Sequence, residues 1–528
     1  MVISSRATPV IVAVDQGTSS TKTIVVDAGG RILSRASVKI SRSDPQPGWV
    51  EQNAAEITTS VTRSLTQAVD ALYDNGGGEF DIRGVGLSNQ RESAVVWNRA
   101  TGEALGPMLG WQDRRTAGRV REFDDLGWSE LVRRKTWLPL DPMISALKIQ
   151  WLLDRVDPER VLATAGQVAV GTVDSWIVYC LTNEHRIETG NASRTQLLNL
   201  ETAQWDPELL ELFRIPFQCL PRIAASNEPT DPIRGVAALP ADTRIYGVLG
   251  DSHAALFAHG IRAPGQVKAT FGTGSSIMGL MSPGAPDEND HRGLVQTIAW
   301  ANPEPAYAFE GTILSTGATL LWLAQLLGLE VEQLNNLAQS ASTSQGVDLV
   351  PAFAGLGAPY WDEKAVAVLS GFGLGTTAAE LAHAAFESVA LQTEDLLGAA
   401  ERAGAPIETV LADGGPTQND WLMQLQADLS QREVVRSNTS ELSATGAAHL
   451  AGISAGLWTV DECARLPRDS SIFLPKMDCE SSLLRRERWR SAVSRSRGQA
   501  VEERPGKVVS PQSEVSCDNS SPRMAETI

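Results

Sequence analysis

The most constraining feature of this sequence is a strand–turn–strand pattern that occurs twice, more than two hundred residues apart. The first copy has a β-branched run at 10–14, a Gly/Thr/Ser turn at 17–20 and a second apolar run at 23–26. The second copy, FGTGSSIM, places the same elements in the same order around the turn at 272–276. A single such turn says little, because Gly-rich polar turns are common in hairpins. Two copies favour a duplicated domain.

Strands and helices alternate after each hairpin. Apolar residues spaced three or four apart predict helices at 54–72 and 381–397. A third helix is predicted at 421–429, directly after the tight turn Asp413-Gly414-Gly415. Further strands are predicted at 31–38, 84–88, 95–97, 245–249 and 409–412. This order indicates an α/β protein with layered domains.

Length, charge and cysteine usage bound the class of protein. The 528 residues suit two large domains, and 42% hydrophobic residues allow sizeable cores. The net charge of −18 argues against nucleic acid and against an anionic membrane surface as partners, because both attract clustered Lys and Arg. No apolar run has the length of a membrane-spanning helix, and the five cysteines are scattered without a CxxC pair. We therefore expect a cytoplasmic protein with no membrane insertion and no structural zinc.

The two hairpin turns and the Asp-Gly-Gly turn at 413–415 share a chemistry that suits phosphate. Each offers backbone N–H groups, and the first adds hydroxyl groups and Lys22. Asp15, at the end of the first strand, has the position to hold a magnesium ion directly or through water. An ordinary Ser/Thr hairpin explains any one turn, but three in one chain favour phosphate or nucleotide binding. Neither a P-loop GxxxxGK[ST] nor a Rossmann GxGxxG occurs.

Two further positions each allow two interpretations. Asp251 stands between a strand and a helix, where it is either a helix N-cap or a general base for phosphoryl transfer. Arg91 and Glu92 lie in a loop between strands, where they form a surface ion pair or grip two neighbouring hydroxyls. Spacing alone leaves the first choice even and favours the surface ion pair in the second.

A hydrolase motif in the sequence is a decoy. Residues 452–456 fit the GxSxG nucleophile elbow. They lie in an alanine-rich helical stretch with no preceding strand, and all six histidines precede Ser454, whereas that fold places its histidine after the serine. We exclude a hydrolase.

Together these motifs resemble the FGGY carbohydrate kinases, and within them most of all the glycerol kinases. The resemblance runs from about residue 10 to residue 480. The NQRE and GLGAPYWD segments are specific to the glycerol-kinase side. The matching stretches include AVDQGTSS (13–20), PGWVEQN (47–53), LSNQRES (87–93), WQDRRT (111–116), GTVDSW (171–176), NASRTQLLN (191–199), FGTGS (271–275), VPAFAGLGAPYWD (350–362) and DGGPTQNDWLMQLQADL (413–429).

The resemblance implies two ribonuclease-H-like (actin-like ATPase) domains, at 9–258 and 259–484, with a nucleotide cleft between them. It implies that Asp251 is the general base and that Asp15 and Asp251 place magnesium. The residues implied to hold the β- and γ-phosphates are Thr18, Ser19, Ser20 and Lys22, and those implied to contact the nucleotide are Thr273, Gly317, Gly415 and Asn419. The residues implied to bind the acceptor are Arg91, Glu92, Trp111, Met143, Ser252 and Ser276.

The implied activity is ATP- and magnesium-dependent phosphorylation of a primary hydroxyl of a small polyol. Glycerol, giving sn-glycerol 3-phosphate, is the best single acceptor, and a homo-oligomer is expected as in the family. Glycerol kinases usually have tyrosine at the position of Met143, glutamine at that of Ser252 and an aromatic residue near Ser276. Two alternatives therefore stay open: a kinase of a longer polyol or a ketose, such as erythritol, a pentitol or xylulose, and a catalytically silent nucleotide-binding regulator.

The composition changes near the end of the chain. From about Arg485 onward it becomes poor in aliphatic and aromatic residues. Such a segment buries too little apolar surface to fold. We expect residues 485–528 to be a disordered tail.

Overall fold

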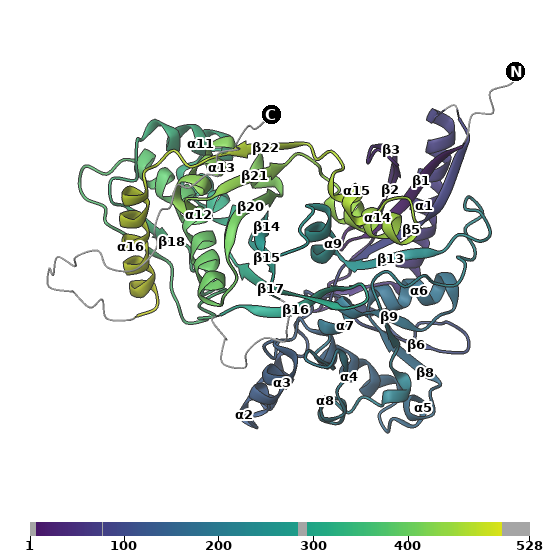
Figure 1. The fold of residues 1–528 in the computed structure, drawn as a ribbon. Helices are drawn as coiled ribbons and strands as arrows, with labels where there is room; N and C mark the ends of the chain where they lie inside the picture. Colours follow the sequence, from purple (N-terminus) through teal and green to yellow (C-terminus); the bar gives the residue numbers. More distant parts are fainter. Residues whose placement is uncertain (1–6, 77, 283–292, 499–528) are drawn as a thin grey trace, which may run out of the picture.

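Two β-sheets of matching topology organise the chain (Figure 1). The computed structural model describes residues 7–76, 78–282 and 293–498. In the first sheet, of order β13-β5-β1-β2-β3, strands β1 to β3 are antiparallel neighbours, β5 is parallel to β1 and β13 is parallel to β5. The second sheet has the order β16-β17-β15-β14-β20-β21-β22 and repeats this plan in β17, β15, β14, β20 and β21. The expected duplication and the two-domain α/β fold are confirmed.

The strands of the first sheet are β1 (Thr8–Gln16), β2 (Ser20–Asp27), β3 (Ile32–Lys39), β5 (Phe80–Asn89) and β13 (Ile245–Gly250). Those of the second sheet are β14 (Gly265–Phe271), β15 (Ser275–Leu280), β16 (Val295–Ala301), β17 (Pro305–Ile313), β20 (Ile407–Asp413), β21 (Glu433–Ser437) and β22 (Ser470–Phe473). Short strand pairs are β4 (Glu51–Gln52) with β7 (Met108–Leu109), β6 (Val95–Asn98) with β8 (Val168–Gly171), β9 (Arg186–Glu188) with β12 (Arg222–Ala224), β10 (Leu198–Asn199) with β11 (Gln204–Trp205), and β18 (Asp348–Val350) with β19 (Val368–Ser370).

The helices of the first half are α1 (Ala54–Gly76), α2 (Ala117–Asp125), α3 (Trp128–Thr136), α4 (Ser145–Val156), α5 (Val161–Thr164), α6 (Val173–Thr182), α7 (Thr189–Ser193), α8 (Pro207–Leu212) and α9 (Asp251–Ala258). Those of the second half are α10 (Gly317–Leu327), α11 (Val331–Ser340), α12 (Ala378–Arg402), α13 (Asp420–Ser430), α14 (Leu442–Ser454), α15 (Val460–Ala464) and α16 (Cys479–Ser496). None of the helices in the described ranges is both long enough and apolar enough to cross a membrane.

Strand β1 is buried on both faces because its alternate residues serve two different cores. Val10, Val12 and Val14 share one hydrophobic cluster with the apolar residues of α1. Ile11 and Ala13 share another with alanines of α14. Successive side chains of a strand point to opposite faces, so a continuous β-branched run is what a sandwiched strand requires.

Helix α14 comes from the second half of the sequence but packs on the first sheet. It contacts β1, β5, β13 and α9, and Figure 1 shows the α9–α14 pair between the two sheets. Small residues permit this close packing: a Cβ on Gly446 would lie 1.8 Å from the carbonyl oxygen of Ala254 in α9. The same helix contains the first three residues of the GxSxG sequence, Gly452 to Ser454, and the hydroxyl of Ser454 donates to the carbonyl of Leu450 within the helix. The exclusion of a nucleophile elbow is thereby confirmed.

The expected start of a disordered tail at Arg485 is wrong. Residues 485–496 belong to α16, which packs against α13 and the β18–β19 strand pair. The Arg485 side chain forms ion pairs with Glu387 and Asp348, and Trp489 is 1% exposed, with its Nε1 donating to Asp395 at 2.7 Å. Trp489 is a large apolar side chain within this polar segment, and its burial anchors the helix. Residues 499–528 lie outside the described part of the chain.

The burial of Trp489 generates a stability prediction. Trp489→Ala should reduce the free energy of unfolding by about 3–5 kcal/mol, because it removes a large buried side chain and leaves Asp395 without its donor. Urea unfolding followed by circular dichroism measures the change. Leu483→Ala on the same helix is the control, since Leu483 is 42% exposed and should matter little. Equal stability of the Trp489 variant and the wild type would mean that α16 is not docked.

Candidate active site

The carboxyl ends of parallel strands from both sheets meet at one cleft. Asp15 lies at the end of β1, and Asp251 directly follows β13. Asp413 ends β20 in the second sheet, and the Gly414-Gly415 turn follows it. In open α/β sheets the ligand site lies outside the carboxyl ends of the strands. The fold therefore concentrates these three carboxylates at its natural binding edge.

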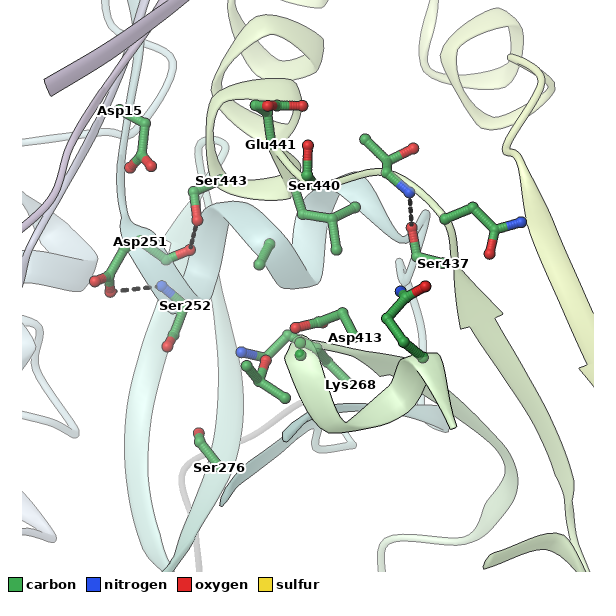
Figure 2. A pocket seen from close by; sticks show the side chains of 18 residues that line it. Asp15, Asp251, Ser252, Lys268, Ser276, Asp413, Ser437, Ser440, Glu441 and Ser443 are labelled. Carbon is green, nitrogen blue, oxygen red and sulfur yellow. Dashed lines mark hydrogen bonds between the residues drawn. The ribbon is translucent and has the colours of Figure 1, made fainter. Parts of the chain in front are cut away.

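These carboxylates line a cavity of about 500 Å³ together with Ser252, Lys268 and Ser276. Figure 2 shows Asp15, Asp251 and Ser252 on one side of it, and Lys268 and Asp413 on the other. Lys268 alternates along β14 with the core residues Val267 and Ala269, so it faces away from the hydrophobic core and towards the cleft.

Burial controls the protonation of the first two carboxylates. Burial, followed by the charge of Asp251, raises the pKa of Asp15 to about 6, although Ser88 donates a 3.0 Å hydrogen bond to it. Burial also raises the pKa of Asp251, against the opposing charge of Arg91. Removing a carboxylate from water disfavours its charged form, which makes it a better proton acceptor.

Asp413 is tuned in the opposite direction. Burial raises its pKa, but the hydrogen bond from His259, with 3.0 Å between His259 Nε2 and Asp413 Oδ2, and the charge of Lys268 outweigh burial and lower it. The cleft therefore holds Asp413, whose charged form is stabilised, opposite Asp15 and Asp251, whose charged forms are disfavoured.

The structure decides against the helix-cap interpretation of Asp251. Gly250 occupies the N-cap position of α9, and Asp251 is the first helical residue. Its Oδ1 accepts a 2.7 Å hydrogen bond from the adjacent Ser252 N–H, and Arg91 Nε lies 3.4 Å from the same oxygen. The Asp251 carboxylate thus lines the cavity, and it accepts from the N–H of its own neighbour, whereas an N-cap side chain accepts from N–H groups two or three residues further along.

Arg91 and Glu92 are buried, so the surface ion-pair interpretation is wrong. Their side chains are 10% and 6% exposed. Arg91 donates two hydrogen bonds to Glu310 of β17, and Glu92 accepts one from Arg194 at 2.7 Å. Buried charges of this kind need partners, and these partners come from distant parts of the sequence.

The backbone of Glu92 is held from α4. Its φ of 61° is unusual for a residue with a side chain. Its carbonyl oxygen accepts hydrogen bonds from Ser145 Oγ at 3.0 Å and Lys148 Nζ at 3.1 Å, and Lys148 also donates to the carbonyl of Met143. Lys148 therefore ties Met143 to Glu92. Burial lowers the pKa of this lysine to about 7, against the charge of Glu92.

Trp111 connects the residues expected to bind the acceptor to the first hairpin turn, at residues 17–20. Its backbone N–H donates to Ser93 Oγ, and its indole Nε1 donates to Thr18 Oγ1 at 3.0 Å. Ser276, in turn, lines the cavity and donates to Glu310 at 3.3 Å. Of the six residues expected to bind the acceptor, five lie in loops or helices between residues 91 and 252, and Ser276 lies on β15 of the second sheet.

A second cavity, of about 800 Å³, adjoins the first and shares Gly415 and Gln418 with it. All four residues expected to contact the nucleotide line it, together with apolar side chains of α10, α11, α12 and α13: its lining includes Thr273, Gly317, Gly415, Asn419, Leu320, Leu321, Val331, Phe386 and Trp421. A wide, partly apolar slot beside a polar turn has the shape and chemistry for a base next to its phosphates.

Glycines allow the turns around this cavity to approach each other. Gly414 has a φ of 98°, and a Cβ on it would lie 2.0 Å from the carbonyl oxygen of Phe271. A Cβ on Gly317 would lie 2.6 Å from the carbonyl oxygen of Gly272. Any larger residue would push the DGG turn and the FGTG turn apart.

The first turn stands apart from both cavities. None of Thr18, Ser19, Ser20 and Lys22 is among the described residues that line either one. The turn follows Asp15 directly, and Lys22 lies opposite Asp15 in the β1–β2 register.

Five residues of the site are not predicted from the sequence: Lys268, Asp413, Arg194, His259 and Glu310. Asp413 and Arg194 lie within the DGGPTQ and NASRTQ stretches. Lys268, His259 and Glu310 belong to no recognisable motif.

Models of one protein family match most of the chain. The FGGY family of carbohydrate kinases, N-terminal domain, matches residues 10–258, and its C-terminal domain matches residues 267–455. The chain belongs to the FGGY family of carbohydrate kinases, so it is a phosphotransferase with an alcohol group as acceptor.

Individual relatives agree over nearly the whole chain. An apulose kinase from Pectobacterium atrosepticum is 40% identical, over 93% of this chain and 99% of its own. A glycerol kinase from Aromatoleum aromaticum is 42% identical, over 92% of this chain and 99% of its own. The crystal structure of Plasmodium falciparum glycerol kinase with ADP has a TM-score of 0.88 at 27% identity, covering 93% and 98% of the two chains. These relatives give the silent-regulator alternative no support.

The raised pKa of Asp15 predicts a stability that depends on pH. Its ordinary value is 3.8, so the folded state holds the proton more tightly than the unfolded state does. Stability therefore falls as the pH rises from about 4 to 6, and the full penalty persists above that range. Asp15→Asn should remove it, raising the free energy of unfolding by about 1–3 kcal/mol at pH 8, with a gain that shrinks towards pH 4.

Thermal unfolding at pH 8 and at pH 4.5, without nucleotide or metal, measures this effect. Asp81→Asn is the matched control, because the Asp81 side chain is 47% exposed. A less stable Asp15→Asn protein at pH 8 would contradict the expected penalty.

Proposed function

We propose that this chain transfers the γ-phosphoryl group of ATP to a primary hydroxyl of a small polyol, with glycerol as the first candidate. The observation that carries the proposal is the meeting of Asp251, Asp15 and the DGG turn in one cleft, beside a second cavity suited to a nucleotide. Two glycerol kinases are among the relatives described above, and one of them was crystallised with ADP.

In this proposal Asp251 is the general base. Burial raises its pKa, which strengthens it as an acceptor for the hydroxyl proton, and its position at the cavity wall lets the deprotonated oxygen attack the γ-phosphoryl group in line. The phosphate oxygens are held by the second hairpin turn, whose Gly272 and Thr273 line the second cavity, and by the first hairpin turn with Lys22, which lies outside both cavities but directly follows Asp15. Thr273, Gly317, Gly415 and Asn419 hold the nucleotide in the second cavity.

The residues present fit a magnesium ion. Asp15 and Asp251 lie close enough for the charge of one to raise the pKa of the other, which is the setting that a divalent cation relieves. No cluster of three or more His, Cys, Asp or Glu residues suited to a metal occurs in the described part of the chain. This matches magnesium, which protein sites usually hold by one or two carboxylates together with substrate phosphates. The chemistry that magnesium supplies when bound is neutralisation of charge on the phosphate oxygens.

The acceptor is held by Arg91, Glu92 and Trp111, with Met143, Ser252 and Ser276 as the outer wall. Ser252 and Ser276 are small and line the cavity, which leaves room beyond a three-carbon acceptor. A ketose is therefore the second candidate, and the 40% identity to an apulose kinase specifically favours it. Spare space in a pocket discriminates weakly between acceptors of different length, by about 1–3 kcal/mol per methylene. We therefore expect the protein to accept both glycerol and longer polyols or ketoses.

A panel assay separates the acceptors. ADP release is measured with glycerol, erythritol, xylulose and apulose, and the values of kcat/KM are compared. Glycerol as the best acceptor supports the first candidate, and a ketose as the best acceptor supports the second. Failure of every polyol and ketose would contradict the proposed substrate class.

Asp251→Asn tests the catalytic assignment. The amide keeps the shape of the side chain but cannot accept the proton, so turnover should fall by roughly 10²–10⁴-fold. Nucleotide binding, measured by calorimetry, should stay nearly intact, because Asp251 does not line the second cavity. Near-normal turnover of this variant would rule Asp251 out as the base.

A further inference from the structure

Four charged side chains form a buried network beside the cleft. Arg91 and Glu92 belong to the loop after β5, Arg194 follows α7, and Glu310 lies on β17 in the second sheet. Their side chains are between 4% and 10% exposed. Two cations and two anions balance, so the network is neutral as a whole. Isolated charges at this depth would be costly, whereas a balanced and hydrogen-bonded set is tolerated.

Glu310 is the hub of the network. Its Oε1 accepts from Arg91 Nη2 at 2.8 Å and its Oε2 accepts from Arg91 Nη1 at 3.1 Å, which makes a bidentate pair. Arg194 Nη1 lies 3.4 Å from Glu310 Oε2, while Arg194 Nε donates to Glu92 at 2.7 Å. A planar guanidinium held at both terminal nitrogens has one orientation.

This bidentate pair decides which way Arg91 faces. With both terminal nitrogens on Glu310, the Nε–H side is turned towards the cavity wall, 3.4 Å from Asp251 Oδ1. His253 Nε2 lies 3.4 Å from Arg91 Nη1, and burial followed by the charge of Arg91 keeps the pKa of this histidine well below its usual range, so it adds no charge. Without Glu310, the carboxylate of Asp251 would be the nearest strong acceptor for the guanidinium.

We propose that Glu310 and Arg194 are positioning residues for the acceptor site. Glu310 reaches across from the second sheet to orient Arg91, and Arg194 links Glu310 to Glu92. Arg91 and Glu92, in the loop after β5, are therefore oriented for binding the acceptor only while the two sheets are packed together. This inference rests on the proposed function, because it takes Arg91 and Glu92 as the residues that bind the acceptor.

The test is the kinetics of Glu310→Gln with glycerol as the acceptor, or with the best acceptor of the wild type. The amide keeps the shape but loses the charge that holds Arg91, so the KM for the acceptor should rise about 10- to 100-fold, as expected for a misplaced binding group. The KM for ATP should change little, because Glu310 does not line the second cavity. An unchanged acceptor KM, or equal increases in both KM values, would overturn the proposal.

Glu394→Gln is the matched control. Glu394 is a buried carboxylate on α12 that also accepts from two arginines, Arg432 and Arg486, but it lines neither cavity of the cleft. It should lower thermal stability and leave the acceptor KM unchanged. A similar rise in acceptor KM in this variant would mean that the Glu310 effect is only a general loss of stability, which would also overturn the proposal.

Arg91→Lys separates this inference from the proposed function. If Arg91→Lys raises the acceptor KM and Glu310→Gln adds nothing further in the double variant, Glu310 acts through Arg91. Independent, multiplicative effects would contradict that route. An unchanged acceptor KM in Arg91→Lys would overturn the acceptor assignment itself, and the inference with it. If Glu310→Gln does not fold, Arg194→Lys carries the same test, since lysine cannot reach both carboxylates at once.

Discussion

The structure depends on one geometric constraint, which is that parallel strands end at a common edge. In each sheet an antiparallel hairpin is followed by parallel strands, and the chain places a carboxylate or a polar turn where such a strand stops. Asp15, Asp251 and Asp413 come from three strands of two sheets and meet without any local sequence signal that joins them. The α9–α14 pair between the sheets, packed through small residues, brings the two edges to the same cleft.

The cleft brings together several charged side chains that are largely shielded from water. Burial raises the pKa of Asp15 and Asp251, while His259 and Lys268 keep that of Asp413 low. Beside these carboxylates, Glu310 and Arg194 form ion pairs with Arg91 and Glu92, and the charges of the four side chains cancel. The site thus pairs strongly compensated charges, which fix geometry, with poorly compensated ones, which are suited to protons and cations. Removing Glu310 should disturb the first group, and removing Asp15 should relieve the second.

Much of the fold and part of the site could be predicted from the sequence. The hairpins, the β-branched strands and the long helices follow local periodicity, and the DGG and FGTG turns mark their own positions. The partners of Arg91 could not be found this way, because Glu310 lies more than two hundred residues further along the chain. Asp251 stays ambiguous in the sequence, since a strand–Asp–helix pattern suits a cap and a base equally. Composition places the start of the tail too early, because a single buried tryptophan, Trp489, outweighs the polar residues around it.

Transfer of a phosphoryl group to an alcohol in this cleft can be measured by following the phosphoryl group itself. The protein is mixed with ATP labelled at the γ-phosphate and with glycerol, erythritol, xylulose or apulose, and the labelled products are separated after one turnover. We expect the label to appear in the phosphate ester of a polyol or ketose, in the same amount as the ADP formed. Label found only in inorganic phosphate, or remaining in ATP with every acceptor, would contradict it.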